Sequence, residues 1–219
     1  MVTNRTIHAV MLILREAAPS WSAPVVSQMA SLSRDPYLVL IACLLSLRTK
    51  DETTGPAARR LFALADTPEK LLTLTPAQIE RAIYPVGFYK TKAQTVLDIS
   101  RGLVEKHGGR VPDEIDELLT FKGVGRKTAN LVVTQGFQKP GICVDTHVHR
   151  ISNRWGYVGT KTPEETEMAL RAKLPQQYWI EINGLLVAMG QTICHPTSPK
   201  CSLCPIERYC AKVGVVRSR

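Results

Sequence analysis

The feature that most restricts the fold of this chain is a pair of glycines, Gly123 and Gly125, set within residues 118–130. A Gly-x-Gly pair allows a turn with positive φ and lets backbone N–H groups approach a partner closely. The helix expected to begin near Gly125 points its N-terminal N–H groups and the positive end of its dipole outward, which favours an anion such as a phosphate. The sequence therefore predicts a helix, a glycine hairpin and a second helix that together form an anion-binding surface.

Two side chains with reactive groups accompany this hairpin. Lys127 falls in the first turn of the second helix, and Asp145 follows eighteen positions later, directly before a third predicted helix. A neutral lysine amine is a nucleophile, and a fixed carboxylate can stabilise positive charge or move protons. The simpler alternatives stay open, because lysines in first turns are usually solvated and an aspartate before a helix is usually its N-cap. Capping would hold the carboxylate in place, so Asp145 can serve both roles.

The run from Gly123 to Asn130, followed by Val144-Asp145-Thr146-His147, resembles the helix-hairpin-helix and Gly/Pro-rich-Asp signature of the endonuclease III family of DNA glycosylases. The resemblance covers most of the chain. It implies a bifunctional DNA glycosylase and apurinic/apyrimidinic lyase of base-excision repair. The expected substrate is double-stranded DNA that contains a damaged base, such as an oxidised pyrimidine, or an abasic site. Lys127 would form a Schiff base and Asp145 would be the second catalytic residue, with strand cleavage by β-elimination.

Helical patterns run through almost the whole chain. Residues 6–16 have amphipathic spacing, and residues 37–47 are apolar on nearly every side, which predicts a central, fully buried helix. Residues 75–78 and 162–165 each match a capping box, and residues 89–107 form a long helical stretch before two glycines. Few windows alternate as a strand does. The sequence therefore predicts an all-α fold.

Domain organisation follows from the resemblance, because no internal repeat or low-complexity linker marks a boundary. The family has a six-helix barrel domain that carries the helix-hairpin-helix, expected here at residues 29–139. An iron–sulfur cluster domain would join residues 1–28 to residues 140–219. The catalytic cleft would then lie between the domains, with Lys127 on one side and Asp145 on the other. Clefts at domain boundaries are common ligand sites.

The charge balance is compatible with a polyanionic partner. The chain has 28 Lys and Arg against 19 Asp and Glu, a net charge of +9. This balance does not identify nucleic acid by itself. No stretch reaches the length needed to span a membrane, and the apolar run of residues 9–14 is too short for a signal peptide. We therefore expect an intracellular monomer without a membrane partner, which in a bacterium would be a cytoplasmic protein associated with the nucleoid.

Four of the six cysteines lie in the last 26 residues with C-x6-C-x2-C-x5-C spacing: Cys194, Cys201, Cys204 and Cys210. Four thiolates this close together can surround one metal centre in a reducing compartment. The spacing alone leaves zinc open, although structural zinc sites more often use two separated C-x-x-C pairs. The resemblance implies that these cysteines hold a 4Fe–4S cluster, which braces a basic loop.

The resemblance also implies which residues contact DNA. An enzyme that acts on a base inside a duplex must flip it out, and side chains then fill the gap. In the family these side chains come from the loop after the first buried helix and from a turn in the middle of the barrel, here Arg48 and Phe88. A solvated helix end and an ordinary surface aromatic are the simpler alternatives. The other expected DNA contacts are Lys122, Gly123, Gly125, Arg126 and His147.

Two residues depart from the usual family pattern. Arg48 stands where many relatives have glutamine, which leaves the opposite-strand contact open. Lys122 stands where a proline commonly precedes the hairpin, which adds a candidate phosphate partner. A monofunctional adenine glycosylase is an alternative within the superfamily, but those relatives lack a lysine at the place of Lys127 and carry a glutamate in the first buried helix, where residues 37–47 have no acid. A non-catalytic DNA-binding module with a structural metal is the alternative from another class.

Overall fold

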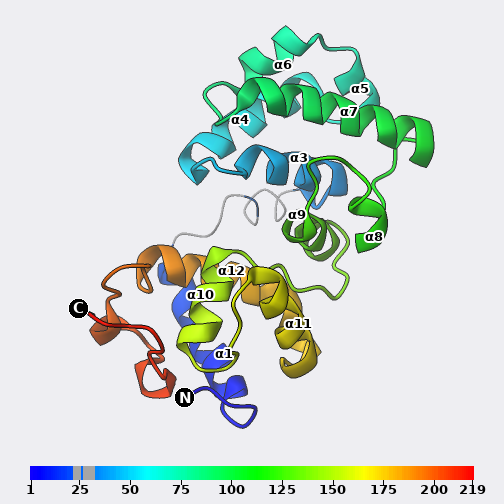
Figure 1. Cartoon of the computed structure of the whole chain (residues 1–219). Coiled ribbons are helices and arrows are strands. Elements are labelled where there is room, and N and C mark those ends of the chain that lie inside the picture. The colour runs from blue at the N-terminus through cyan, green and yellow to red at the C-terminus, as the bar shows by residue number, and fades with distance from the viewer. Residues whose placement is uncertain (22–25, 27–32) are drawn as a thin grey trace. The chain divides into compact units, whose positions relative to one another are not determined.

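The computed structural model describes residues 1–21, 26 and 33–219, and among them every regular element is helical (Figure 1). The predicted all-α fold is confirmed. The chain divides into two compact units, a terminal unit of Met1–Pro24 and Pro140–Arg219 and a central unit of Val25–Lys139. The predicted domain boundary between residues 28 and 29 lies outside the described residues.

The central unit is built around one apolar helix, α3. Its helices are α3 (Pro36–Ser46), α4 (Asp51–Leu64), α5 (Pro68–Leu72), α6 (Pro76–Ile83), α7 (Tyr89–His107), α8 (Ile115–Leu118) and α9 (Arg126–Leu131), and α9 continues as a π-helical segment, Val132–Gly136. Eight of the 11 residues of α3 are buried, and α3 contacts α4, α7, α9 and the π-helical segment. A helix that is apolar on all sides must be surrounded in this way. The predicted central helix is therefore confirmed.

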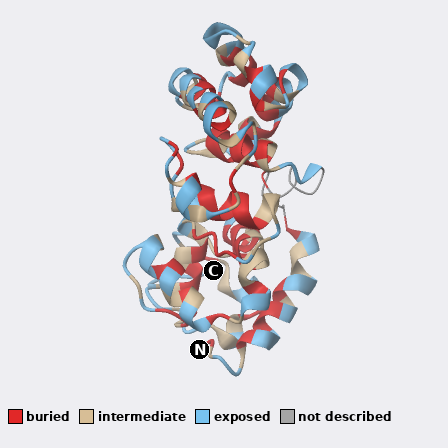
Figure 2. Cartoon of the chain, turned by 90° about the vertical axis from the view of Figure 1, so that its right-hand side faces the viewer, coloured by how far each residue is buried: buried red, intermediate tan, exposed pale blue. Residues whose placement is uncertain are grey.

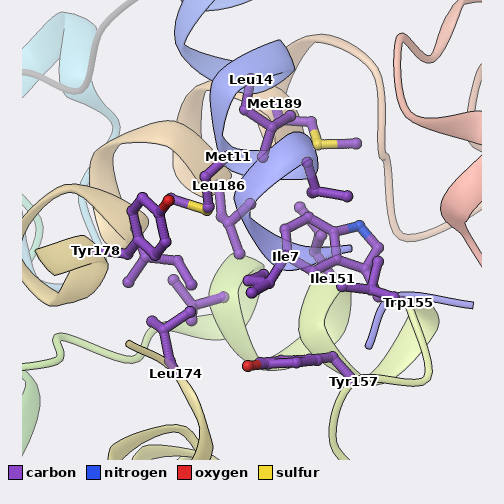
Figure 3. Close-up of a cluster of buried hydrophobic side chains, with 14 of the residues drawn as sticks. Ile7, Met11, Leu14, Ile151, Trp155, Tyr157, Leu174, Tyr178, Leu186 and Met189 are labelled. Atoms are coloured by element: carbon purple, nitrogen blue, oxygen red, sulfur yellow. The ribbon is translucent and has the colours of Figure 1, made fainter. Parts of the chain in front are cut away.

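The terminal unit brings the N-terminal helix together with the last third of the chain. Its helices are α1 (Ile7–Ala17), α10 (Thr146–Arg154), α11 (Pro163–Lys173) and α12 (Trp179–Thr192), with short 3₁₀ turns between and after them. The apolar face predicted for α1 is buried in a cluster with side chains of α10 and α12 (Figure 3). Burial of each large apolar side chain stabilises the fold by about 1.5–3 kcal/mol. The two ends of the chain therefore share one core.

Side-chain caps begin several helices. At α6, Gln78 N donates to Thr75 Oγ1 and Thr75 N donates to Gln78 Oε1, at 3.3 and 2.8 Å, so the predicted capping box is confirmed. The second predicted box is only half formed. Thr162 caps α11 by accepting from Glu165 N, but the Glu165 carboxylate accepts from Lys161 N, one residue before the cap. The prediction of a full box at Thr162 was therefore wrong.

The long helix α7 has the bounds that the sequence predicts. Gly108 ends it with φ 58°, and the Gly109 N–H donates to Leu103 O at 3.0 Å, as is usual where a glycine terminates a helix.

Figure 2 shows that buried residues of both units lie along inner helix faces, while exposed residues lie outside. Within the described residues, no helix is both long and apolar enough to cross a membrane.

Candidate functional site

The glycine hairpin joins α8 to α9, and its two glycines differ in conformation. Gly123 has φ +92°, which L side chains rarely adopt, and a Cβ there would lie 3.0 Å from Thr95 Cγ2. Gly125 is extended, with φ −99° and ψ 175°, and open space surrounds the position of a Cβ. The turn therefore requires glycine at position 123. At position 125, the missing side chain leaves the approach to the helix end open.

Lys127 lies in the first turn of α9 and is exposed. The N-cap residue is Gly125, which has no side chain to cap the helix, and the first intrahelical bond runs from Ala129 N to Gly125 O at 2.9 Å. Lys127 lies near enough to the last turn of α3 for its charge to act on Cys43. Burial raises the pKa of the Cys43 thiol there to about 12, and the nearby Lys127 charge opposes that rise. Lys127 thus adds positive charge at a helix end that already favours anions.

Asp145 is the N-cap of α10. Its Oδ1 accepts hydrogen bonds from His147 N and Val148 N, each at 2.9 Å, so the predicted capping role is confirmed. Within the terminal unit, the described residues donate no hydrogen bond to Oδ2. The carboxylate is therefore held in place through one of its two oxygens. Lys127 belongs to the central unit, and a shared cleft for the two residues stays a prediction.

Arg48 and Phe88 meet on the central unit. The Arg48 guanidinium lies over the Phe88 ring, 4.9 Å from its centroid, and both side chains are exposed. Both backbones are left-handed, with φ 55° and 57°, a conformation that costs an L-residue roughly 1–2 kcal/mol. Such strain persists only where neighbouring groups hold it, and it often occurs at ligand sites. The structure thus brings together the two residues predicted to fill the gap left by a flipped base.

The remaining predicted DNA-contact residues lie in two settings. Lys122 is exposed and Arg126 is half-buried, and both flank the glycine hairpin. His147 lies against α12 in the terminal unit: its Nδ1 is 3.1 Å from Arg150 Nη2, and a Cβ on Gly190 would collide with the imidazole. The DNA contacts of these residues stay predictions.

The four cysteines predicted as metal ligands all line one cavity in the terminal unit. Burial raises the pKa of Cys204 to about 12 and also raises the pKa of Cys210, and the neighbouring thiols strengthen both shifts. In the part of the chain that the structure describes, no three His, Cys, Asp or Glu side chains converge closely enough to hold a single metal ion. The structure therefore brings the four cysteines to one cavity, and the metal that they hold stays a prediction.

Comparison with known proteins identifies the family. A family model described as HhH-GPD superfamily base excision DNA repair protein matches residues 41–176. Endonuclease III of Thermotoga maritima is 51% identical over 176 residues, which make up 80% of this chain and 83% of that protein. The chain belongs to the endonuclease III family.

Solved endonuclease III structures agree with this assignment. A non-covalent endonuclease III–DNA complex matches with a TM-score of 0.84 and 31% identity, over 97% of each chain. A trapped endonuclease III–DNA covalent intermediate matches with the same values. The resemblance predicted from the sequence is confirmed. As a member of the endonuclease III family, the protein is a base-excision-repair DNA glycosylase with AP lyase activity.

Three charged residues of this chain donate hydrogen bonds beside the candidate site residues. No signal in the sequence identifies them. Arg150 Nη2 donates to Cys194 O at 2.8 Å. Arg154 donates to Cys194 Sγ at 3.3 Å and to His195 O at 2.7 Å. Lys92 of α7 donates to oxygens at the end of α3. The hydrogen bonds compensate for the burial of these charges, and their partners lie too far along the chain to form a local motif.

Proposed function

We propose that this protein acts as a monomer on double-stranded DNA and removes damaged pyrimidines, chiefly oxidised ones, through a Schiff base on Lys127. The observation that carries the proposal is the exposed Lys127 in the first turn of α9, directly after the glycine hairpin. Such helix ends bind phosphate, so a DNA backbone held there brings its sugar towards the amine. The similarity to a trapped endonuclease III–DNA covalent intermediate supports a covalent route.

One amine accounts for both activities. The neutral amine of Lys127 attacks C1′, the N-glycosidic bond breaks, and the base leaves with the bonding electrons and takes up a proton. The nitrogen then loses a proton, and the C1′–O4′ bond opens as O4′ takes up a proton, which leaves a protonated Schiff base and a free O4′ hydroxyl. This cation acidifies C2′. Loss of a proton from C2′ expels the 3′ phosphate by β-elimination, and water finally releases Lys127.

Asp145 is the second catalytic residue in this proposal. Oδ1 caps α10 and so fixes the carboxylate. Oδ2 is available to stabilise positive charge on the sugar or to carry protons. The proposal requires both side chains to reach the same sugar. It also assigns the six-helix barrel to residues 29–139 and the cluster domain to residues 1–28 and 140–219.

The same proposal gives the DNA-contact residues their roles. Arg48 and Phe88 fill the gap left by the flipped base, which their stacking on one exposed site supports. The residues around the hairpin bind backbone phosphate, which their positive charge favours. These residues are Lys122, Gly123, Gly125 and Arg126. His147 adds a DNA contact from the terminal unit.

We also propose that Cys194, Cys201, Cys204 and Cys210 hold a 4Fe–4S cluster. Four thiols that line one cavity match the donor set of such a cluster. A C-x6-C-x2-C-x5-C loop also differs from the two separated C-x-x-C pairs that structural zinc sites more often use. When bound, the cluster cross-links the loop that contains Lys200, Arg208 and Lys212. Lys212 pairs with Glu207 at 2.7 Å, and Lys200 and Arg208 are the candidate phosphate contacts.

Borohydride trapping tests the proposed nucleophile, because reduction turns a Schiff base into a stable covalent bond. The wild-type protein should form a covalent complex with a duplex that contains an abasic site, and Lys127→Ala should abolish it. Lys106→Ala, at an exposed lysine of α7, is the matched control and should trap normally. No complex with the wild type would refute the lyase route. A complex with Lys127→Ala would assign the nucleophile to another amine.

A further inference from the structure

Lys92 of α7 is a buried lysine that the proposed chemistry does not use. Only 8% of it is exposed, and its Nζ donates to Leu45 O at 2.7 Å, to Leu47 O at 2.6 Å and to Thr49 Oγ1 at 3.1 Å. Leu45 lies in the last turn of α3, whose carbonyls have no partner within the helix. A cation is favourable at this negative end of a helix dipole. The three donors of one ammonium thus meet three acceptors.

The same contacts join the turn that carries Arg48 to the turn that carries Phe88. Thr49 Oγ1 also accepts the Gly87 N–H at 3.1 Å, and Phe88 O accepts the Lys92 N–H at 2.9 Å. A Cβ on Gly87 would lie 2.9 Å from Arg48 O, so glycine allows the two turns to approach this closely. Lys92 therefore bonds to both turns, through its side chain on one and its backbone on the other.

The two exposed side chains depend on this anchoring. Arg48 and Phe88 both have left-handed backbones, which their own side chains disfavour. Neighbouring groups must therefore hold the conformation, and the Lys92 network supplies bonds beside each residue. Burial lowers the pKa of Lys92 to about 8, so at neutral pH most molecules still carry the ammonium with its three donors.

We propose that Lys92 is a positioning residue that sets the Arg48–Phe88 pair for insertion into the space of a flipped base. The inference rests on the gap-filling role proposed above. Lys92 acts through the two turns and does not itself contact DNA. Misplacement of such a pair by about 1 Å can lower a rate by about 100-fold. Loss of the ammonium should therefore slow reactions that need gap filling and spare those that do not.

Lys92→Met tests this difference, because it removes the donors and keeps an unbranched chain of similar length. We expect base removal from a damaged duplex to slow by about 10- to 100-fold. Borohydride trapping on a single-stranded abasic oligonucleotide should keep the wild-type rate, because a single strand has no stacked duplex to open. Lys90→Met, at an exposed lysine on the same helix, is the matched control and should behave as wild type on both substrates.

Thr49→Val tests the same network without removing a charge. It deletes the hydroxyl that joins the two turns and keeps the size of the side chain. Thr49→Val should slow base removal from the duplex and leave trapping on the single strand unchanged.

In a Phe88→Ala background, Lys92→Met should cause a much smaller further loss of the duplex base-removal rate, because half of the pair that it positions is already absent.

Two results would overturn the proposal. Equal losses on both substrates, in Lys92→Met and in Thr49→Val, would mean that the network serves only the stability of the central unit. Fully additive losses in the Phe88→Ala background would mean that Lys92 does not act through the pair. A wild-type protein that is not trapped on either substrate would instead contradict the proposed lyase route, and the duplex base-removal comparison would still test Lys92.

Discussion

Asp145 caps α10, and the proposed function gives the same side chain a chemical role. Its Oδ1 accepts two N–H groups at the start of α10, and the described residues of its unit leave Oδ2 without a donor. Capping needs only an acceptor oxygen, whereas stabilisation of a positive sugar needs a negative charge. Substitution can therefore separate the two roles.

We predict that Asp145→Asn folds normally but loses activity. The amide oxygen can still cap α10, because Asn and Asp cap about equally well. Loss of the charge should slow base removal by at least about 100-fold. Asp145→Ala should lose activity as well and should lower the free energy of unfolding by about 1 kcal/mol. Single-turnover excision and urea unfolding measure the two effects, and full activity of Asp145→Asn would contradict the catalytic role.

Among the helices, the hairpin between α8 and α9 shows that a repeated residue can have two different tasks. Gly123 provides a positive φ that the turn requires, and a Cβ there would lie 3.0 Å from Thr95 Cγ2. Gly125 has ordinary extended angles and open surroundings. One glycine therefore maintains the fold of the hairpin, and the other leaves open space in front of the helix, where the proposed function places a phosphate.

Alanine at each glycine should have opposite effects on stability and binding. Gly123→Ala should lower the free energy of unfolding by roughly 1–2 kcal/mol, because the new side chain disfavours positive φ. Gly125→Ala should leave the thermal midpoint at or above the wild-type value and weaken binding to abasic duplex, because a methyl group then covers the helix end. Thermal unfolding and fluorescence anisotropy measure these changes. Normal DNA affinity for Gly125→Ala would exclude a close phosphate at this position.

On the scale of the whole molecule, the chain forms two units, and the cysteine loop belongs to the one that contains both chain ends. Ile193, directly before the loop, and Ile206, within it, lie in the same core as α1. A metal centre that cross-links the loop would therefore also hold this core together. The central unit has its own buried helix, α3, and its stability should not depend on the loop.

We predict that Cys204→Ser lowers iron and sulfide content and loosens the terminal unit alone. Hydrogen exchange should increase in α1, α10 and α12 and remain unchanged in α3, because the two units have separate cores. Cys43→Ala, at the buried cysteine of α3, is the control and should keep full iron content. One zinc and no iron in the wild-type protein would overturn the proposed cluster.

The sequence by itself determined the features that arise within a few neighbouring residues. The apolar spacing of α1, the all-round apolarity of α3 and the Thr75–Gln78 capping box could be predicted because each interaction forms within one or a few helical turns. The motif around Lys127 and Asp145 belongs to the same class, since it occupies one continuous stretch and marks the family.

Only the tertiary structure decided which distant groups meet. Lys92 bonds to Leu45, 47 positions earlier, and Arg154 bonds to Cys194, 40 positions later. The Glu165 carboxylate accepts a hydrogen bond from Lys161 N instead of completing the predicted capping box. Each of these outcomes depends on how side chains compete for partners once helices pack, and no short window of sequence contains that competition.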